Sequence, residues 1–227
     1  MVFAHDTEEA LGAAADLVNT AEEPDQLSTI EDLDTFYREA GWKGRHPGDQ
    51  AELADVRALR PTLRHMWLSG GVEQVECVNA LLRNGGAMPQ VVRHDEFDWH
   101  LHATTPDEPL ATRMAVEAAM AMVDVIRMGE TERLKICDAD GCACIFADLS
   151  RNRSRRYCST ACSNRMAAAA YRTRQSEAGN TDTDTDSDSD TDGGSSVAGD
   201  RANDRANSSV AGDGANGDDA VHEAREG

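Results

Sequence analysis

Residues 137–162 read CDADGCACIFADLSRNRSRRYCSTAC, which places two close pairs of cysteines on either side of a 15-residue loop. The pairs are Cys137 with Cys142 and Cys158 with Cys162. Two such pairs, each closing a short turn, are typical of a structural site in which four thiolates surround one metal ion. Soft sulfur ligands in a tetrahedral arrangement favour Zn²⁺. The spacing therefore predicts one structural zinc ion bound by these four cysteines.

Two further cysteines lie outside this predicted set. Cys144 could replace Cys142 as a ligand, but both together would form a strained chelate, so we leave Cys144 out. Cys77 lies on the apolar face of an expected helix, and we expect it to be buried. Because we expect no signal peptide, the chain should fold in a reducing compartment, which disfavours a disulfide framework.

The charge of the chain changes sign along the sequence. In total, 22 basic and 42 acidic residues give a net charge of −20. Residues 151–175 nevertheless contain seven Arg and no acidic residue, whereas residues 1–150 carry a net charge of −16 and residues 176–227 one of −11. A basic segment in an acidic chain indicates a localised anion-binding surface, although a solvated Arg face is the alternative.

Arg and Asn side chains in this segment have the chemistry that nucleic acids need. Arg makes bidentate contacts with phosphates, and both residue types can read base edges. The predicted nucleic-acid contacts are Arg151, Asn152, Arg153, Arg155, Arg156, Asn164, Arg165, Arg172 and Arg174. For Asn164 and Arg165, bracing the zinc site is an equal alternative.

Hydrophobic periodicity upstream of the cysteines predicts a mainly α domain. We expect helices over residues 7–20, 28–41, 49–68, 72–83 and 105–128. Ser28 and Glu31 would form a capping box at the start of the second helix. Pro61 is expected to kink or divide the third helix. Thr105 and Glu108, with a proline between them, predict the start of the fifth helix.

A period-two pattern interrupts the helices. Residues 97–103 alternate apolar and polar side chains, and residues 90–93 could pair with them across a turn at 94–96 to form one β-hairpin. His100 and His102 would share one face of this strand, with His94 nearby. A metal site there is conceivable, but we favour a solvated face because no other compact ligand set adjoins it.

The end of the chain differs in composition from the rest. An Ala-rich stretch from Ser159 to Arg174 predicts a helix. Beyond it, Thr or Ser alternates with Asp, and too few apolar residues remain to offset the conformational entropy of folding. We therefore expect a helical domain with one β-hairpin (1–130), a four-cysteine zinc finger made of a knuckle and a C-terminal helix (131–175), and a disordered acidic tail (176–227).

The composition also indicates an environment. Lys43 and Lys135 are the only lysines among 22 basic residues. An acidic surface with almost no Lys predicts adaptation to a saline cytoplasm, as in a halophilic archaeon, although an acidic protein from a low-salt organism is the alternative. No stretch is long and apolar enough to span a membrane, and we expect a cytoplasmic protein without a membrane partner.

Residues 137–174 resemble the CGNR-type zinc finger. Besides the cysteine pairs, the resemblance rests on Phe146, Asp148, Ser150-Arg151-Asn152, Arg155-Arg156, Ser159 and Cys162-Ser163-Asn164-Arg165. Two positions depart from the pattern, since Ser163 stands in place of the Gly of the naming tetrad and Tyr157 in place of a usual Trp. Ser163 argues against a need for left-handed backbone geometry there, and neither departure removes a zinc ligand.

The N-terminal part is similar to the ABATE domain that precedes this finger. Its marks are Leu17-Val18-Asn19-Thr20, Leu33 to Gly41-Trp42, and Ala58-Leu59-Arg60. The resemblance implies a stress-induced transcription regulator whose finger binds DNA. Asn19, the polar residue of its motif, is expected either to hydrogen-bond within the helix packing or to line a ligand cleft.

Three classes of function follow from these patterns. The leading hypothesis is a DNA-binding regulator whose helical domain senses an unknown effector or forms a homodimer. The alternative is a protein-interaction module, or an RNA binder, in which the finger is a structural staple. An enzyme is not expected, because four thiolates leave zinc no open coordination position and no catalytic motif is present. The acidic tail could compete for the Arg face.

Overall fold

The computed structural model of the chain describes residues 2–93 and 99–179, all of which belong to one compact unit. The predicted hairpin turn at 94–96 lies outside these described residues. Residues 176–179, predicted as the start of the disordered tail, instead extend the last helix, and the rest of the predicted tail, from residue 180 onward, lies outside the described residues. Within the described ranges, no helix is both long and apolar enough to cross a membrane. The proposed domain boundaries at 130 and 175 remain predictions.

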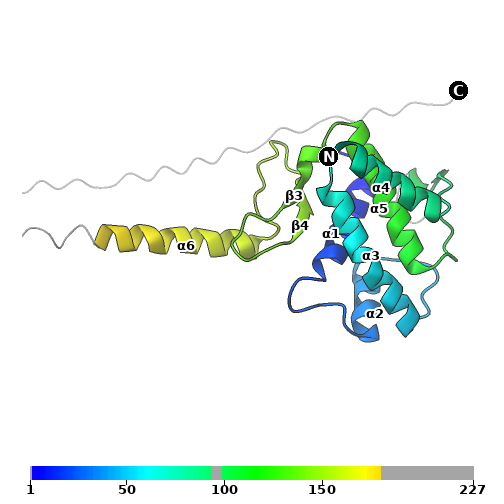
Figure 1. Cartoon of the computed structure of the whole chain (residues 1–227), viewed down its shortest axis with the longest axis horizontal. Helices are drawn as coiled ribbons and strands as arrows, with labels where there is room; N and C mark the ends of the chain where they lie inside the picture. Colours follow the sequence, from blue (N-terminus) through cyan, green and yellow to red (C-terminus); the bar gives the residue numbers. More distant parts are fainter. Residues whose placement is uncertain (1, 94–98, 180–227) are drawn as a thin grey trace, which may run out of the picture. The chain divides into compact units, whose positions relative to one another are not determined.

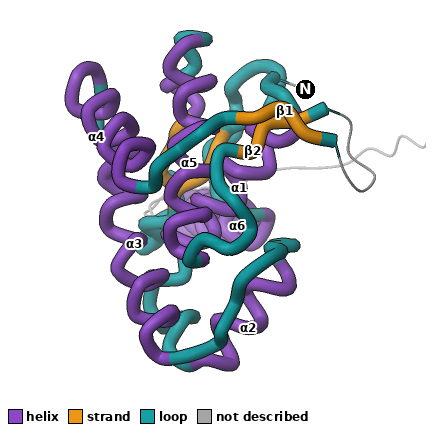
Figure 2. The backbone as a smooth tube through the Cα atoms, turned by 90° about the vertical axis from the view of Figure 1, so that its right-hand side faces the viewer, coloured by secondary structure: helices purple, strands orange, loops and turns teal. Residues whose placement is uncertain are grey.

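Six α-helices contain most of the described residues, so the prediction of a mainly α fold is confirmed (Figure 1). They are α1 (His5–Asn19), α2 (Ile30–Glu39), α3 (Gln50–Leu68), α4 (Gly71–Asn84), α5 (Leu110–Arg127) and α6 (Thr160–Gly179). Helix α5 is central, because α1, α3 and α4 all pack against it (Figure 2). Helix α2 packs on α3.

The sequence of α5 explains its central position. Small side chains let the neighbouring helices approach closely, and larger ones fill the remaining space. The buried alanines are Ala115, Ala118, Ala119 and Ala121, and the fully buried larger residues are Leu110, Val116, Met122 and Val125. Burying one such Leu, Val or Met side chain contributes about 1.5–3 kcal/mol, so this helix supplies much of the driving force for folding.

Two helix starts differ in detail from the sequence prediction. Helix α2 is capped by Thr29 and Asp32 rather than Ser28 and Glu31, because the Asp32 carboxylate accepts the N–H groups of both Ser28 and Thr29 at 2.9 Å. Helix α5 begins at Leu110 and not at 105–108. A residue that precedes proline is disfavoured in the helical conformation, and Pro109 therefore prevents Glu108 from joining the helix.

Helix α3 agrees with its predicted bounds and is continuous through Pro61. Asp49 caps its start by accepting the N–H of Glu52 at 2.9 Å. A proline inside a helix removes one backbone hydrogen bond. The helix is nevertheless undivided, because Val56 before the proline and Leu63 after it are both buried in the same core.

Two antiparallel hairpins accompany the helices. The first pairs β1 (Gln90–Val92) with β2 (His100–His102), which confirms the predicted hairpin over its described part. The second was not predicted and pairs β3 (Leu134–Ile136) with β4 (Ile145–Ala147), after a short 3₁₀ turn η1 (Thr131–Arg133). The two faces of β4 belong to different cores, since Ile145 and Ala147 join the helical core whereas Phe146 packs on the cysteine cluster.

Candidate zinc centre and basic helix

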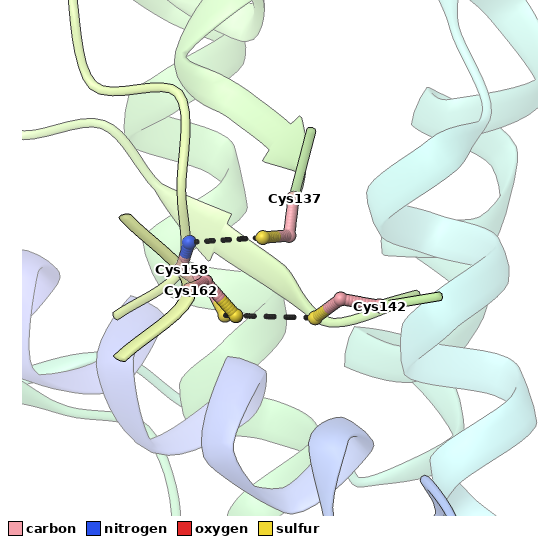
Figure 3. A group of neighbouring side chains, drawn as sticks. All are labelled: Cys137, Cys142, Cys158 and Cys162. Carbon is pink, nitrogen blue, oxygen red and sulfur yellow. Dashed lines mark hydrogen bonds between the residues drawn. The ribbon is translucent and has the colours of Figure 1, made fainter. Parts of the chain in front are cut away.

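The four cysteines that the spacing predicts as zinc ligands lie together (Figure 3). The Sγ atoms of Cys137, Cys142, Cys158 and Cys162 are all within 4.8 Å of one another. The Cys158 Sγ lies 3.8 Å from that of Cys142 and 3.7 Å from that of Cys162. Sulfur atoms about 2.3 Å from a tetrahedral Zn²⁺ are about 3.8 Å apart. The cluster therefore has the dimensions of a site for one structural zinc ion.

Backbone N–H groups assist this cluster. Cys137 Sγ accepts from the N–H of Cys158 at 3.3 Å and from that of Ala139, and Cys142 Sγ accepts from the N–H of Cys144. Burial raises the pKa of Cys137, but hydrogen bonds from these backbone groups and from the Cys158 and Cys142 thiols together outweigh it and lower that pKa below its usual value. Burial raises the pKa of Cys142 to about 11. Four thiolates at this spacing need a cation among them, so the donor set fits Zn²⁺.

Cys144 supports the cluster through its backbone. Its carbonyl accepts the N–H of Cys137 at 2.9 Å, and within the described chain its thiol does not belong to the group of four. The second cysteine pair is held by a helix start, as predicted, because the Ser159 hydroxyl accepts the N–H of Cys162 at 3.2 Å and α6 begins at the next residue. The first turn of a helix favours negative charge, which suits thiolates there.

The loop between the cysteine pairs is organised by Asp148, which is fully buried. Its carboxylate lies 2.6 Å from the Lys135 ammonium and accepts from the Ser150 hydroxyl and from the N–H of Arg155 at 2.5 and 2.9 Å. Burial raises the pKa of Asp148, but Lys135 and Ser150 outweigh it and lower that pKa to about 2. Asp148 therefore stays ionised and fixes where the basic loop leaves the strand.

Asn19 joins the helical bundle to the strand that carries the cysteines. Its side-chain amide donates to the carbonyl of Ile145 at 2.9 Å and its amide oxygen accepts the N–H of the same residue at 2.8 Å. The Asn19 side chain thus takes the place of a neighbouring strand beside β4. Two roles were predicted for Asn19, a hydrogen bond within the helix packing and a place in a ligand cleft. The structure supports the hydrogen bond, although its partner is on β4 and not on another helix. Arg64 of α3 adds a second link by donating to the carbonyl of Ala143 at 2.8 Å.

With this geometry in place, two family models match the chain. The model for ABATE, described as "Putative stress-induced transcription regulator", matches residues 11–129. The model for the CGNR zinc finger matches residues 133–175. The chain belongs to the ABATE family. A comparison with the curated proteins found no match.

Both departures from the CGNR pattern are accommodated in the finger. Ser163 lies within α6, where its N–H donates to the carbonyl of Ser159 at 3.1 Å, so this position needs no left-handed residue. Tyr157 is half-buried against the cysteine cluster and carries the Arg156 guanidinium 5.4 Å above its ring. The tyrosine therefore keeps an aromatic wall beside the zinc centre, as expected.

Four of the nine predicted nucleic-acid contacts are bound to groups in the finger or directly before it. Arg153 pairs with Glu130 and Glu132, and Arg156 pairs with Asp138. Arg155 donates to the carbonyls of Tyr157 and Cys158 and lies 4.9 Å from the centre of the Phe146 ring. Arg165 donates to the carbonyl of Asp140 and to the Cys162 sulfur. These four arginines brace the zinc centre, whatever else they contact.

The other five predicted contacts are differently placed. They are Arg151, Asn152, Asn164, Arg172 and Arg174, all exposed. In the part of the chain that the structure describes, their side chains have no hydrogen bond or ion pair. Helix α6 continues beyond Met166 with every side chain through Ser176 exposed, except for half-buried Ala169. The CGNR finger therefore presents a solvated helix with unpaired arginines.

The histidine pair of the ABATE domain does not complete a metal site. The Nε2 atoms of His100 and His102 lie 3.1 Å apart, so the predicted common face is confirmed. Among residues 2–93 and 99–179, however, the four cysteines form the only group of three or more potential ligands. His94 lies outside the described residues.

Proposed function

We propose that this ABATE-family protein is a DNA-binding transcription regulator whose CGNR finger contacts DNA through α6 and the loop before it. The observation that supports this most directly is α6 itself. A solvated helix with unpaired arginines, anchored at one end by a zinc centre, suits insertion into a DNA groove. In a chain with a net charge of −20, a 25-residue segment with seven Arg and no acid offers phosphates a local attraction.

In this proposal, the nine predicted contacts have two different roles. The four bound arginines position the loop and α6, and they offer their remaining N–H groups to phosphates. Arg151, Asn152, Asn164, Arg172 and Arg174 supply the side chains that reach phosphates and base edges, because they give up no internal bond on binding. The zinc ion is structural in this proposal, and we propose no enzymatic reaction.

The test measures binding of fluorescently labelled double-stranded DNA to the zinc-loaded full chain by anisotropy. The variant carries Arg172→Ala and Arg174→Ala, which remove two exposed charges from α6. Each lost phosphate contact should reduce the slope of log K against log salt by about 0.9, so we expect weaker binding and a slope smaller by about 1–2.

A matched control removes two exposed arginines from the ABATE domain, Arg83→Ala and Arg127→Ala. We expect this variant to bind DNA like the wild type. Equal DNA binding by both double variants would reject α6 as the contact. Capture of a protein partner that survives nuclease treatment would instead favour the interaction-module alternative, and preference for RNA would favour the RNA alternative.

Three finer points belong to the same proposal. We propose a cytoplasmic regulator adapted to a saline interior, on the basis of the acidic excess and the two lysines. Counterion release weakens as bulk salt rises, so contacts with bases and with groove shape would then carry more of the affinity. We also propose a homodimer, since two linked fingers raise affinity for two half-sites; light scattering of the zinc-loaded chain tests this.

A further inference from the structure

A groove of about 690 Å³ lies where the ABATE domain meets the CGNR finger. One wall is the junction of α3 and α4, from Trp67 to Gly70. The finger lines the groove with residues of β3 and with Arg155 and Arg156. Its volume is within the range of about 300–1,000 Å³ that small-molecule sites occupy.

The groove has apolar walls that are open to solvent. Leu68, at the end of α3, is 45% exposed, and Ile136, at the end of β3, is 44% exposed. Both residues line the groove, one from each domain. Large aliphatic side chains exposed along one concave surface are typical of a binding site for an apolar body.

The finger side of the groove offers a positioned cation. Arg156 uses its Nε to bind Asp138 at 2.9 Å, and its guanidinium lies over the Tyr157 ring, 5.4 Å from the ring centre. Its two terminal nitrogens have no hydrogen-bond partner in the described part of the chain. The guanidinium is therefore held at its Nε edge and on one face. The N–H groups of its other edge can form a bidentate pair with an oxyanion.

The helical side of the groove adds donors. Helix α4 begins at Gly71 with Gly70 as its cap, and no side chain satisfies the first-turn N–H groups. Trp67 is 2% exposed, and its Nε1 has no hydrogen-bond partner among the described residues; the same holds for the Ser69 hydroxyl. A buried indole N–H without an acceptor is costly, so these two residues provide unused hydrogen-bonding capacity beside the groove.

We propose that this groove binds a small organic carboxylate with an apolar body. The apolar body lies between Leu68 and Ile136, and the carboxylate pairs with the unused edge of Arg156. The start of α4 favours the same negative charge from the other side. Glu132 and Asp138 also line the groove, so a ligand with a single negative charge fits better than a polyanion.

This site would give the protein an effector, a consequence that rests on the proposed DNA-binding function. Arg155 and Arg156 belong both to the groove and to the predicted nucleic-acid contacts. A carboxylate on Arg156 neutralises a charge that would otherwise attract phosphate, so it should weaken DNA binding. By linkage, DNA should weaken carboxylate binding by the same factor.

The test uses the zinc-loaded full chain and 8-anilinonaphthalene-1-sulfonate, an anion with an aromatic body that fluoresces in apolar surroundings. We expect saturable binding that benzoate displaces and the neutral isostere benzamide does not. Leu68→Glu and Ile136→Glu should each weaken dye binding by about tenfold, which corresponds to about 1.4 kcal/mol. The matched control is Val75→Glu on α4, which is 37% exposed and outside the groove.

Each outcome decides the proposal. Equal dye affinity in the wild type, Leu68→Glu and Ile136→Glu would overturn it, as would the absence of saturable binding. Equal displacement by benzoate and benzamide would overturn the carboxylate preference. The dye titration contains no DNA, so dye binding without DNA binding would reject the proposed function and leave the groove site standing, and the reverse result would reject the groove site alone.

Discussion

Removal of the Asn19 side-chain amide should weaken the link between the ABATE domain and the CGNR finger. In Asn19→Ala, both backbone groups of Ile145 lose the partners that now lie at 2.8 and 2.9 Å. Ile145 is fully buried, so the two groups become unsatisfied in the interior. Each such group costs about 1–3 kcal/mol, and we therefore expect the free energy of unfolding to fall by about 2–6 kcal/mol.

Urea unfolding of the zinc-loaded chain at about pH 7.5, followed by circular dichroism, measures this loss. The matched control is Asn79→Ala, because Asn79 is exposed on α4. Its expected effect is below about 0.5 kcal/mol. If Asn19→Ala unfolds at the same urea concentration as the control, the amide does not hold β4 and the reasoning is refuted. We also expect the Asn19 variant to lose zinc faster to a chelator, since β4 directly follows the knuckle that contains Cys142.

Three other predictions concern zinc, pH and the tail. Cys142→Ser should abolish stoichiometric zinc binding by the purified chain, whereas Cys144→Ser should retain one zinc per chain in a metal assay; equal loss would contradict the assigned ligands. Burial raises the pKa of Glu117 to about 7, so the wild type should lose stability as the pH rises from about 4.5 to 7, while Glu117→Gln should not. The advantage of the Gln variant in urea melts should therefore grow between about pH 5.5 and 7 and reach at most about 3 kcal/mol by about pH 8; a constant difference would refute this sign. Deletion of residues 180–227 should tighten DNA binding at low salt, if the acidic tail competes for the Arg face, and unchanged affinity would count against that competition.

The zinc centre was predictable because its ligands are close in sequence. The cysteine spacing and the helix start at Ser159 both act over a few residues, and local geometry was enough to bring four sulfurs together. The role of Cys144 was harder to predict, because it supports the cluster through its backbone and not through its thiol. Its carbonyl accepts the N–H of Cys137, and its N–H donates to the Cys142 sulfur.

Helices were predictable as elements and less so at their ends. Apolar periodicity, and for α6 the alanine content, identified the six described helices, but Pro109 moved the start of α5 and Asp32 moved the capping box of α2 by one residue. These errors arise because several neighbouring residues can each cap a helix, and small differences in local geometry decide among them.

The strand pair β3–β4 was missed because its two three-residue strands carry almost no periodic signal. Its stability depends on partners far away in the chain, with Ile145 in the helical core and Phe146 against the cysteines. Asp148 gave one local signal, an acidic residue that precedes a strongly basic loop, but its Lys135 partner becomes visible only when the two strands pair.

The amino-acid sequence by itself therefore determined the helical class, the four zinc ligands and the position of the basic segment, because each depends on spacing or charge within a short stretch. Tertiary structure alone decided which arginines brace the finger and which remain unpaired, how Asn19 holds β4, and that a groove is lined by the end of α3, the start of α4 and the finger. These features depend on contacts between residues far apart in the chain, 126 positions for Asn19 and Ile145, or on opposite sides of one cleft. Their free energies come from desolvation and geometry in the folded chain, which no local pattern encodes.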